Sequence, residues 1–155
     1  MSIITVREYL KKFDKDQNII ELKQSTATVQ LAALALGVEP ARIAKTLSFK
    51  DKEGAIIVVV AGDTKVDNKK FKTTFGLKAK MLSPDEVIEF TGHKIGGVCP
   101  FGITKNNTKI YLDESLKRFQ TVFPACGSSN SAIELSCEEL ENLCSISGWV
   151  DVCSF

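Results

Sequence analysis

The stretch "ARIAKTLSFKDKEGAIIVVVA", residues 41–61, is expected to form the centre of the fold. Pro40 suits the first turn of a short helix over "ARIAK", and "TLSFK", "DKEG" and "AIIVVVA" then indicate a strand, a turn and a second strand. The run from Ile56 to Val60 is apolar at every position, which is typical of a strand that is buried on both faces. The stretch therefore predicts a sheet with its second strand in a central place.

Helical and extended patterns surround this stretch in an irregular order. Helices are expected over residues 6–14, opened by a capping box of Thr5 and Glu8, over 29–36 and 67–76, and from capping boxes at Ser83–Glu86 and Ser136–Glu139. Short strands are expected at residues 18–23, 109–114, 120–126 and 131–135, with a loop over 91–108. Since no strict βαβ alternation appears, the order predicts an α+β domain with a mixed, strongly curved sheet.

Length and composition predict one globular domain over residues 1–155, because 44% of the chain is hydrophobic and can fill one core. The 20 basic and 19 acidic side chains nearly cancel, so no overall field indicates a nucleic acid or membrane partner. No stretch is long and apolar enough for a membrane span, and a cytoplasmic protein is expected. Five cysteines without a C-x-x-C pair predict reduced thiols, with no disulfide framework, no metal site and no cofactor.

The loop "TGHKIGGVCPFG", residues 91–102, contains the single histidine of the chain. One reading makes Cys99 a nucleophile and His93 its base, which needs hydrogen-bond contact between them. The other reading makes His93 a surface loop side chain and Cys99 a small residue in a pocket wall. The second reading is favoured, because nothing in the sequence enforces the contact.

Two glycine sites could build a pocket from backbone. Gly96 and Gly97 would let the chain turn sharply near a ligand, with Pro100 holding the turn open. The segment "CGSSN", residues 126–130, could offer consecutive N–H groups to an anion or a polarised carbonyl, although a hairpin turn is the simpler reading.

Lysines provide the remaining candidates. Lys45 is expected at the junction of a short helix and a strand, where its cation could lie near a cleft or simply reach water. Between Asp63 and Lys80 there are six lysines and two aspartates, so this region is locally basic. That charge suits a phosphate backbone, although a solvated helix face is the default reading.

Taken together, several segments resemble the YbaK/EbsC family, the free-standing relatives of the editing domain of bacterial prolyl-tRNA synthetases. The segments run in order over about residues 25–145 and are "ARIAKTLSFK", "VVVAGDTKVDNKKF", "TGHKIGGVCPFG", "DESL" and "GSSNSAIELS". The resemblance implies one α+β domain around a mixed, barrel-like sheet flanked by helices. It also implies an aminoacyl-tRNA deacylase that hydrolyses the ester joining a wrong amino acid to tRNA.

The resemblance assigns roles to particular residues. It implies a catalytic Lys45 and an oxyanion site at Gly127, Ser128 and Ser129. The residues expected to line the substrate pocket are Thr46, Gly96, Gly97, Val98, Cys99, Pro100, Phe101 and Asn130. The basic region described above, and not the resemblance, predicts a tRNA contact at Lys65, Lys69 and Lys70. Cys99 stands where relatives commonly carry Ser or Pro, which argues against a thiol nucleophile. Asn130 stands where many relatives carry Gly.

The expected reaction removes a small amino acid, namely Ala, Ser, Thr or Cys, from a mischarged tRNA, with tRNA for proline first. Prolyl-tRNA synthetase is a candidate partner, and the nucleophile is water, helped or not by the substrate's ribose hydroxyl. An ester is already activated, so orientation and charge stabilisation can carry most of the catalysis. The alternative is a non-catalytic module of the same fold that binds tRNA or a synthetase.

Overall fold

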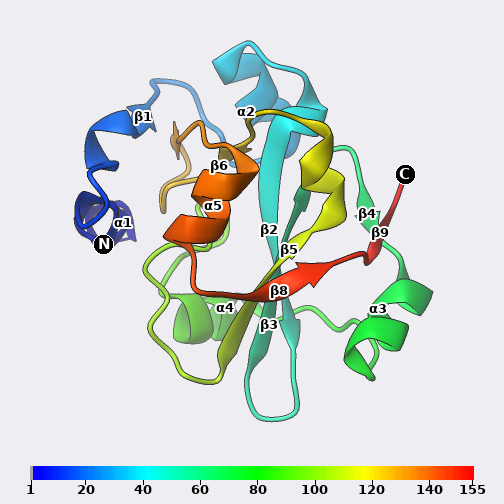
Figure 1. Cartoon of the computed structure of the whole chain (residues 1–155). Coiled ribbons are helices and arrows are strands. Elements are labelled where there is room, and N and C mark those ends of the chain that lie inside the picture. Colours follow the sequence, from blue (N-terminus) through cyan, green and yellow to red (C-terminus); the bar gives the residue numbers. More distant parts are fainter. Residues whose placement is uncertain (1) are drawn as a thin grey trace.

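A computed structural model describes residues 2–155 and contains a mixed five-stranded sheet that curls as a half-barrel (Figure 1). Its strand order is β6-β2-β3-β5-β8, in which β2 and β3 are antiparallel and the other neighbours are parallel. The strands are β2 (Ile43–Lys50), β3 (Ala55–Ala61), β5 (Thr108–Asp113), β6 (Phe123–Pro124) and β8 (Ile146–Val150). The expected α+β class with a mixed, curved sheet is confirmed.

Strand β3 is the centre of the sheet, and all seven of its residues are buried. Its side chains alternate between two cores, as the pleat requires. Val59 and Ala61 belong to the core on one face, and Val58 and Val60 belong to the core on the other. The central strand predicted from "AIIVVVA" is therefore confirmed.

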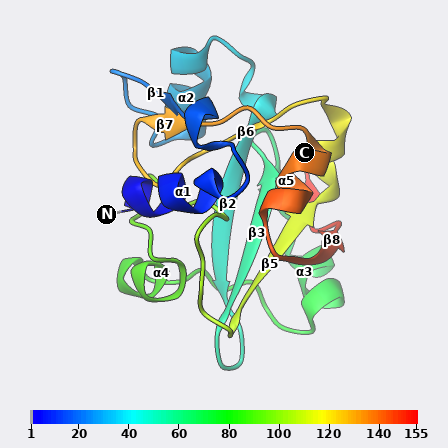
Figure 2. The same cartoon turned by 60° about the vertical axis from the view of Figure 1, so that its left-hand side comes forward.

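Five helices cover the sheet. Helices α1 (Ser2–Lys11) and α5 (Cys137–Leu143) lie on one face (Figure 2), and α3 (Asn68–Phe75) packs Phe71 into the core of the other face. Helix α2 (Val29–Leu36) packs beside Ile43, and α4 (Pro84–Thr91) packs beside Ala55. None of the helices within residues 2–155 has the length and apolar character that crossing a membrane requires.

Short elements complete the fold. They are the 3₁₀ helices η1 (Asp16–Asn18), η2 (Pro40–Arg42) and η3 (Glu114–Arg118), and two small antiparallel sheets that pair β1 (Ile20–Glu21) with β7 (Ser131–Ala132) and β4 (Lys65–Val66) with β9 (Cys153–Ser154).

The local signals for four helices are confirmed. Helix α2 ends at Gly37, which has a φ of 70°, and the Asp67 side chain caps α3 by accepting from two backbone amides. Complete capping boxes start α4 at Ser83 and α5 at Ser136.

Three expectations are corrected. Helix α1 begins at Ser2, so Thr5 lies inside the helix and is not its N-cap. The short helix expected over "ARIAK" is only η2, because pairing of Ile43 with β6 and of Ala44 with β3 extends β2 back to Ile43. Lys45 is therefore a strand residue. Strands β8 and β9 were not predicted, since the sequence around Gly148 gives no alternating pattern.

Candidate active site

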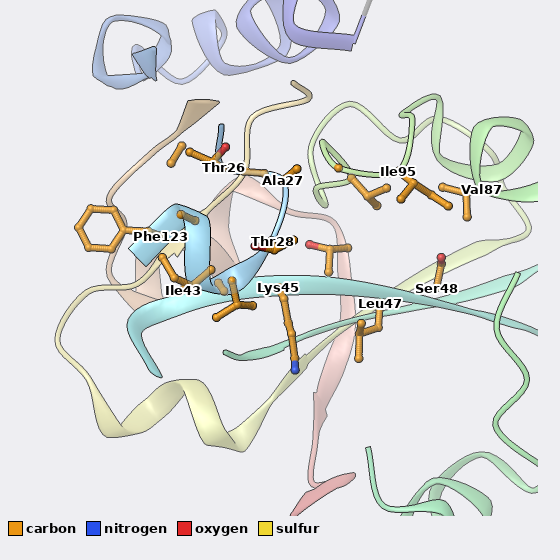
Figure 3. Close-up of a pocket in the computed structure, with 18 of the residues that line it drawn as sticks. Thr26, Ala27, Thr28, Ile43, Lys45, Leu47, Ser48, Val87, Ile95 and Phe123 are labelled. Carbon is orange, nitrogen blue, oxygen red and sulfur yellow. The ribbon is translucent and has the colours of Figure 1, made fainter. Parts of the chain in front are cut away.

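A cavity of about 330 Å³ lies against strand β2 (Figure 3). Residues 26–29, which lead into α2, and the loop residues Ile95 and Gly96 form part of its other walls. Six consecutive residues of β2, 43–48, line it. Because side chains of a strand alternate between faces, a cavity that touches all six must lie along the strand's edge.

The edge of β2 is open at this point. Strand β6 pairs with residues 43–44 only, and further along the same edge the amide of Leu82 donates to the Ser48 carbonyl at 3.1 Å. Even-numbered residues of β2 therefore direct their backbone groups away from β3. Among residues 2–155, no strand pairs with this edge at positions 45–47. The N–H and C=O of Thr46 consequently face the cavity.

The side chain of Thr46 is also unusual. Its Oγ1 is buried and has no hydrogen-bond partner, a condition shared within the described chain only by Nδ1 of His93. A buried polar atom without a partner costs about 1–3 kcal/mol. A ligand in the cavity that accepts from this hydroxyl would recover that cost.

Lys45 emerges on the opposite face of the sheet. It pairs with Val60, whose side chain belongs to the core beside α3. Its Nζ donates to the Thr64 carbonyl at 2.6 Å, and Figure 3 shows the nitrogen pointing away from Thr28 and Ile95. Burial lowers the pKa of Lys45, an effect opposed by nearby Cys153 and Asp63. Lys45 is thus among the residues that line the cavity, but its cation points away from it.

The two glycine loops touch one another. A Cβ on Gly97 would lie 2.7 Å from the backbone N of Ser128, and one on Gly96 would lie 3.7 Å from Cβ of Ser129. Gly97 thus allows two backbones to meet. Beyond this contact is a second hollow of about 490 Å³, lined by Gly97, Lys94, Ile95 and residues 127–129. The candidate oxyanion donors Gly127, Ser128 and Ser129 line this hollow and not the cavity at β2.

The rest of the "GGVCPFG" wall is divided. Val98 lines the cavity at β2. Cys99 and Phe101 are 0% exposed in the main core and Pro100 is buried too, so these three side chains line neither hollow. The expectation that they form the substrate wall is corrected, because the turn at Gly96 and Gly97 carries the following residues inward.

The structure does bring Cys99 and His93 together. The Cys99 Sγ lies 3.5 Å from Nε2 of His93, and His93 is only 1% exposed, so the surface reading of this histidine was wrong. Nε2 also lies 2.8 Å from the Phe101 carbonyl, to which it must donate a proton. Burial raises the pKa of Cys99 to about 12 and lowers that of His93. A thiol held neutral beside a nitrogen that already carries a proton is not an activated nucleophile.

The lysines proposed for tRNA and the residue Asn130 have separate positions. Lys65 and Lys69 are exposed on β4 and α3, whereas Lys70 donates to Asp151 at 3.1 Å and to the Cys153 carbonyl at 2.8 Å. The Asn130 amide donates to the Leu22 carbonyl at 2.9 Å. Asn130 therefore closes the second glycine loop against the chain next to β1.

Some cavity residues carried no sequence signal. Thr26, Thr28 and Ser48 line the cavity, yet only Ser48 could have been noticed, because it lies two residues after Thr46 in a predicted strand. Within residues 2–155, no group of three or more His, Cys, Asp or Glu side chains is placed to hold a metal ion.

A sequence profile described as "Aminoacyl-tRNA editing domain" matches residues 23–143. The protein YwhH of Bacillus subtilis is 53% identical over 154 residues, which are 99% of this chain and 98% of YwhH. A protein of Enterococcus faecalis named "Putative Cys-tRNA(Pro)/Cys-tRNA(Cys) deacylase EbsC" is 30% identical over 118 residues, covering 75% of this chain and 71% of that protein.

Solved structures give the same result. A crystal structure described as "a putative trans-editing enzyme for prolyl tRNA synthetase" superposes with a TM-score of 0.88 at 31% identity. The superposition covers 99% of this chain and 98% of that one.

Proposed function

Because the chain belongs to the aminoacyl-tRNA editing domain family, we propose that it hydrolyses the ester of a small, wrongly attached amino acid on tRNA. Alanine, serine, threonine and cysteine are the candidate amino acids, and tRNA for proline is the first candidate carrier. Mischarged tRNA is found in the cytoplasm, which is where we expect the protein to act.

The observation that carries this proposal is the cavity at the open edge of β2. Its volume of about 330 Å³ is at the small end of the range for ligand sites, roughly 300–1,000 Å³. Apolar side chains such as Val98 and Ile43 line much of it, and these limit size without binding a charged group. Such a wall excludes large amino acids far better than it separates small ones. We therefore expect overlapping activity on several small residues.

The polar groups of the cavity suit an ester carbonyl. The hydroxyl and the backbone N–H of Thr46 face the space where the carbonyl oxygen would lie, and both would stabilise the charge that develops on it. Water, or water helped by the adjacent ribose hydroxyl, adds to the carbonyl carbon. The bond to the ribose oxygen then breaks, and that oxygen takes up a proton.

Lys45 would add a cation to this site by rotating around the β2 edge. Lys45 is among the residues that line the cavity, and its Nζ donates to the backbone carbonyl of Thr64. Catalytic contacts are often incomplete without substrate. We propose that the ammonium leaves Thr64 when the ester binds and then faces the developing oxyanion.

We also propose that Lys65, Lys69 and Lys70 receive tRNA phosphates. Lys65 and Lys69 are exposed, while Lys70 is partly neutralised by Asp151. The affinity for tRNA should fall with added salt. Reversing the charges of Lys65 and Lys69 together should make this fall less steep. An unchanged salt slope in the double variant would place the tRNA elsewhere.

A non-catalytic tRNA- or synthetase-binding module remains the second candidate. The observation that favours it is that Lys45 is the one ionisable side chain among the described residues lining the cavity, so no carboxylate or imidazole there can act as a general base.

Deacylation rates decide between these two functions. Alanyl-, seryl-, threonyl-, cysteinyl- and prolyl-tRNA for proline would be compared under one condition, with and without the synthetase. Hydrolysis of one or more of the four small esters, with prolyl-tRNA spared, is expected. Fastest hydrolysis of prolyl-tRNA, or no hydrolysis of any ester, would refute the deacylase.

A further inference from the structure

Strand β9 has no part in the function proposed above, yet its residue Cys153 lies near Lys45. The one strand partner of β9 within residues 2–155 is β4, which follows directly after Thr64. We propose that the β4–β9 pair is a latch, which holds the ammonium of Lys45 outside the cavity until tRNA phosphates loosen the pair. The inference rests on the proposed deacylase function and adds a coupling between phosphate binding and the position of Lys45.

The direction of the Thr64 carbonyl depends on β4. This carbonyl belongs to the same planar peptide unit as the amide of Lys65, which is the first residue of β4. Two residue pairs join β4 to β9. While these pairs are formed, the Thr64 carbonyl stays 2.6 Å from Nζ of Lys45. The pairing of two short strands therefore determines where the cation lies.

Strand β9 is anchored at its start and is short beyond that point. The amide of Val152 donates to the buried carboxylate of Asp113 at 2.9 Å, and the carbonyl of Val152 accepts from the Asp67 amide at 2.7 Å. Val152 is 0% exposed, whereas Phe155, just after β9, is 83% exposed. Segments with few contacts open locally while the core stays folded. The latch can therefore open beyond Val152 without unfolding of the domain.

The lysines proposed to receive tRNA phosphates lie on both sides of the latch. Lys65 belongs to β4, and Nζ of Lys70, on α3, donates to the Cys153 carbonyl at 2.8 Å. Figure 1 shows α3, β4 and β9 together at one side of the sheet. The ion pair of Lys70 with Asp151 is exposed and contributes little. A phosphate brings a full negative charge to Lys70, whereas the carbonyl offers only a dipole, so phosphate binding draws Lys70 away from β9.

Opening of the latch makes the cation of Lys45 available to the cavity. Burial lowers the pKa of Lys45, because a buried ammonium is costly unless oxygen atoms surround it. When the Thr64 carbonyl turns away, the ammonium loses that acceptor. Asp63 does not replace it, because both of its carboxylate oxygens accept from Arg118, at 3.1 and 2.6 Å. The oxyanion that develops on a bound ester then supplies the negative charge that the ammonium lacks.

A disulfide across the latch tests the inference. Val66 lies directly opposite Cys153 in an antiparallel pair, where Cα atoms are about 4.5–5.5 Å apart and a disulfide fits. Val66→Cys would be oxidised with glutathione disulfide, and its single-turnover deacylation would be measured on the ester that the wild type hydrolyses best. The oxidised form should be about tenfold slower than the reduced form, because Lys45 stays at Thr64. Reduction of the same sample should restore the rate, which shows that the fold is intact.

The matched control is Val66→Cys combined with Cys153→Ser, which cannot form the disulfide. This double variant and the wild type should each keep the same rate before and after oxidation. Equal rates of the oxidised and reduced Val66→Cys protein, with the disulfide verified by mass spectrometry, would overturn the latch and leave the deacylase intact. A loss of rate in the oxidised double variant as large as that in Val66→Cys would also overturn it.

A second measurement does not depend on hydrolysis. The protein would be acetylated briefly with acetic anhydride, with and without a blunt-ended RNA duplex, and acetylation of each lysine would be quantified by mass spectrometry. The duplex carries phosphates but has no single-stranded end that could enter the cavity. Acetylation of Lys45 in the wild type should rise about threefold with the duplex, because the latch opens, while acetylation of Lys65 and Lys69 should fall. In oxidised Val66→Cys, the duplex should leave acetylation of Lys45 unchanged.

The two proposals can fail separately. If the protein hydrolyses no ester, but the duplex increases acetylation of Lys45 only when the latch is not locked, the deacylase is refuted and the latch is supported. Unchanged acetylation of Lys45 in the wild type, or the same increase in the locked protein, would overturn the latch.

Discussion

Two regions of the molecule contain candidate reactive side chains, and only one of them is open to a ligand. In the loop after α4, Cys99 lies 3.5 Å from His93, but both side chains are enclosed in the core. At the edge of β2, Thr46 and Lys45 line a cavity, and the buried hydroxyl of Thr46 has no hydrogen-bond partner. The side chains of the first region are in contact with each other, whereas those of the second region are accessible to a ligand.

The difference teaches that burial decides what a polar pair can do. Enclosure keeps the Cys99 thiol neutral and leaves His93 to bind a carbonyl, so this pair stabilises the loop. An open strand edge has the opposite effect, because it leaves hydrogen-bonding groups unsatisfied until a ligand arrives.

The largest effect is expected at Lys45. Lys45→Ala should lower the deacylation rate by roughly 10² or more, because a group that stabilises developing charge is removed. Its hydrogen bond to the Thr64 carbonyl is a single contact, so the variant should still fold. Single-turnover rates and circular dichroism would measure both effects, with Lys52→Ala as the control. A folded variant with wild-type activity would remove Lys45 from the mechanism.

Thr46→Val should separate catalysis from stability. Loss of the hydroxyl should lower the rate about tenfold, the value of one hydrogen bond to the carbonyl. The free energy of unfolding should stay equal or rise by about 1 kcal/mol, because a buried atom without a partner disappears. Thr46→Ser restores the hydroxyl and should recover the rate. A loss of both rate and stability in the valine variant would indicate a structural role.

His93 should give the buried pair a pH-dependent stability. Burial lowers the pKa of His93 below its ordinary 6.5, so the unfolded chain binds a proton first as the pH falls. The contribution of neutral His93 to the free energy of unfolding is therefore fully present above pH 6.5. Below pH 6.5 the free energy of unfolding falls by up to about 1.4 kcal/mol per pH unit. Urea unfolding of the wild type and of His93→Gln between pH 7 and 5.5 would measure it. If the free energies of unfolding of the two proteins change equally with pH, the expected loss of stability from His93 is absent and the prediction is wrong.

The smallest effect is expected at Cys99. Cys99→Ser should keep the deacylation rate, because the thiol is enclosed and lines neither hollow. Alkylation of the native protein should modify Cys137 first, since this is the one cysteine that is not buried. Loss of turnover in Cys99→Ser, or after alkylation of Cys99 alone, would restore the nucleophile reading and reverse the comparison.

The sequence by itself determined the elements whose signals are local. The apolar run Ile56–Val60 identified the central strand, and caps at Asp67, Ser83 and Ser136 identified three helix starts, because each depends on neighbouring residues only. The same patterns gave the mixed α+β class. A family resemblance, and not a local pattern, placed Lys45 and Thr46 among the candidate site residues.

Only the tertiary structure decided which of these residues meet. Pairing with β3 and β6 made Lys45 a strand residue and sent its cation to the face opposite Thr46. The residues expected to form one site are distributed over two hollows, with Gly96 at the cavity of β2 and Gly97 and Ser128 at the other hollow. The open edge of β2 exists because β6 is two residues long, which no pattern in β2 itself records. Such contacts join residues far apart in the chain, and their free energy depends on packing that local patterns do not encode.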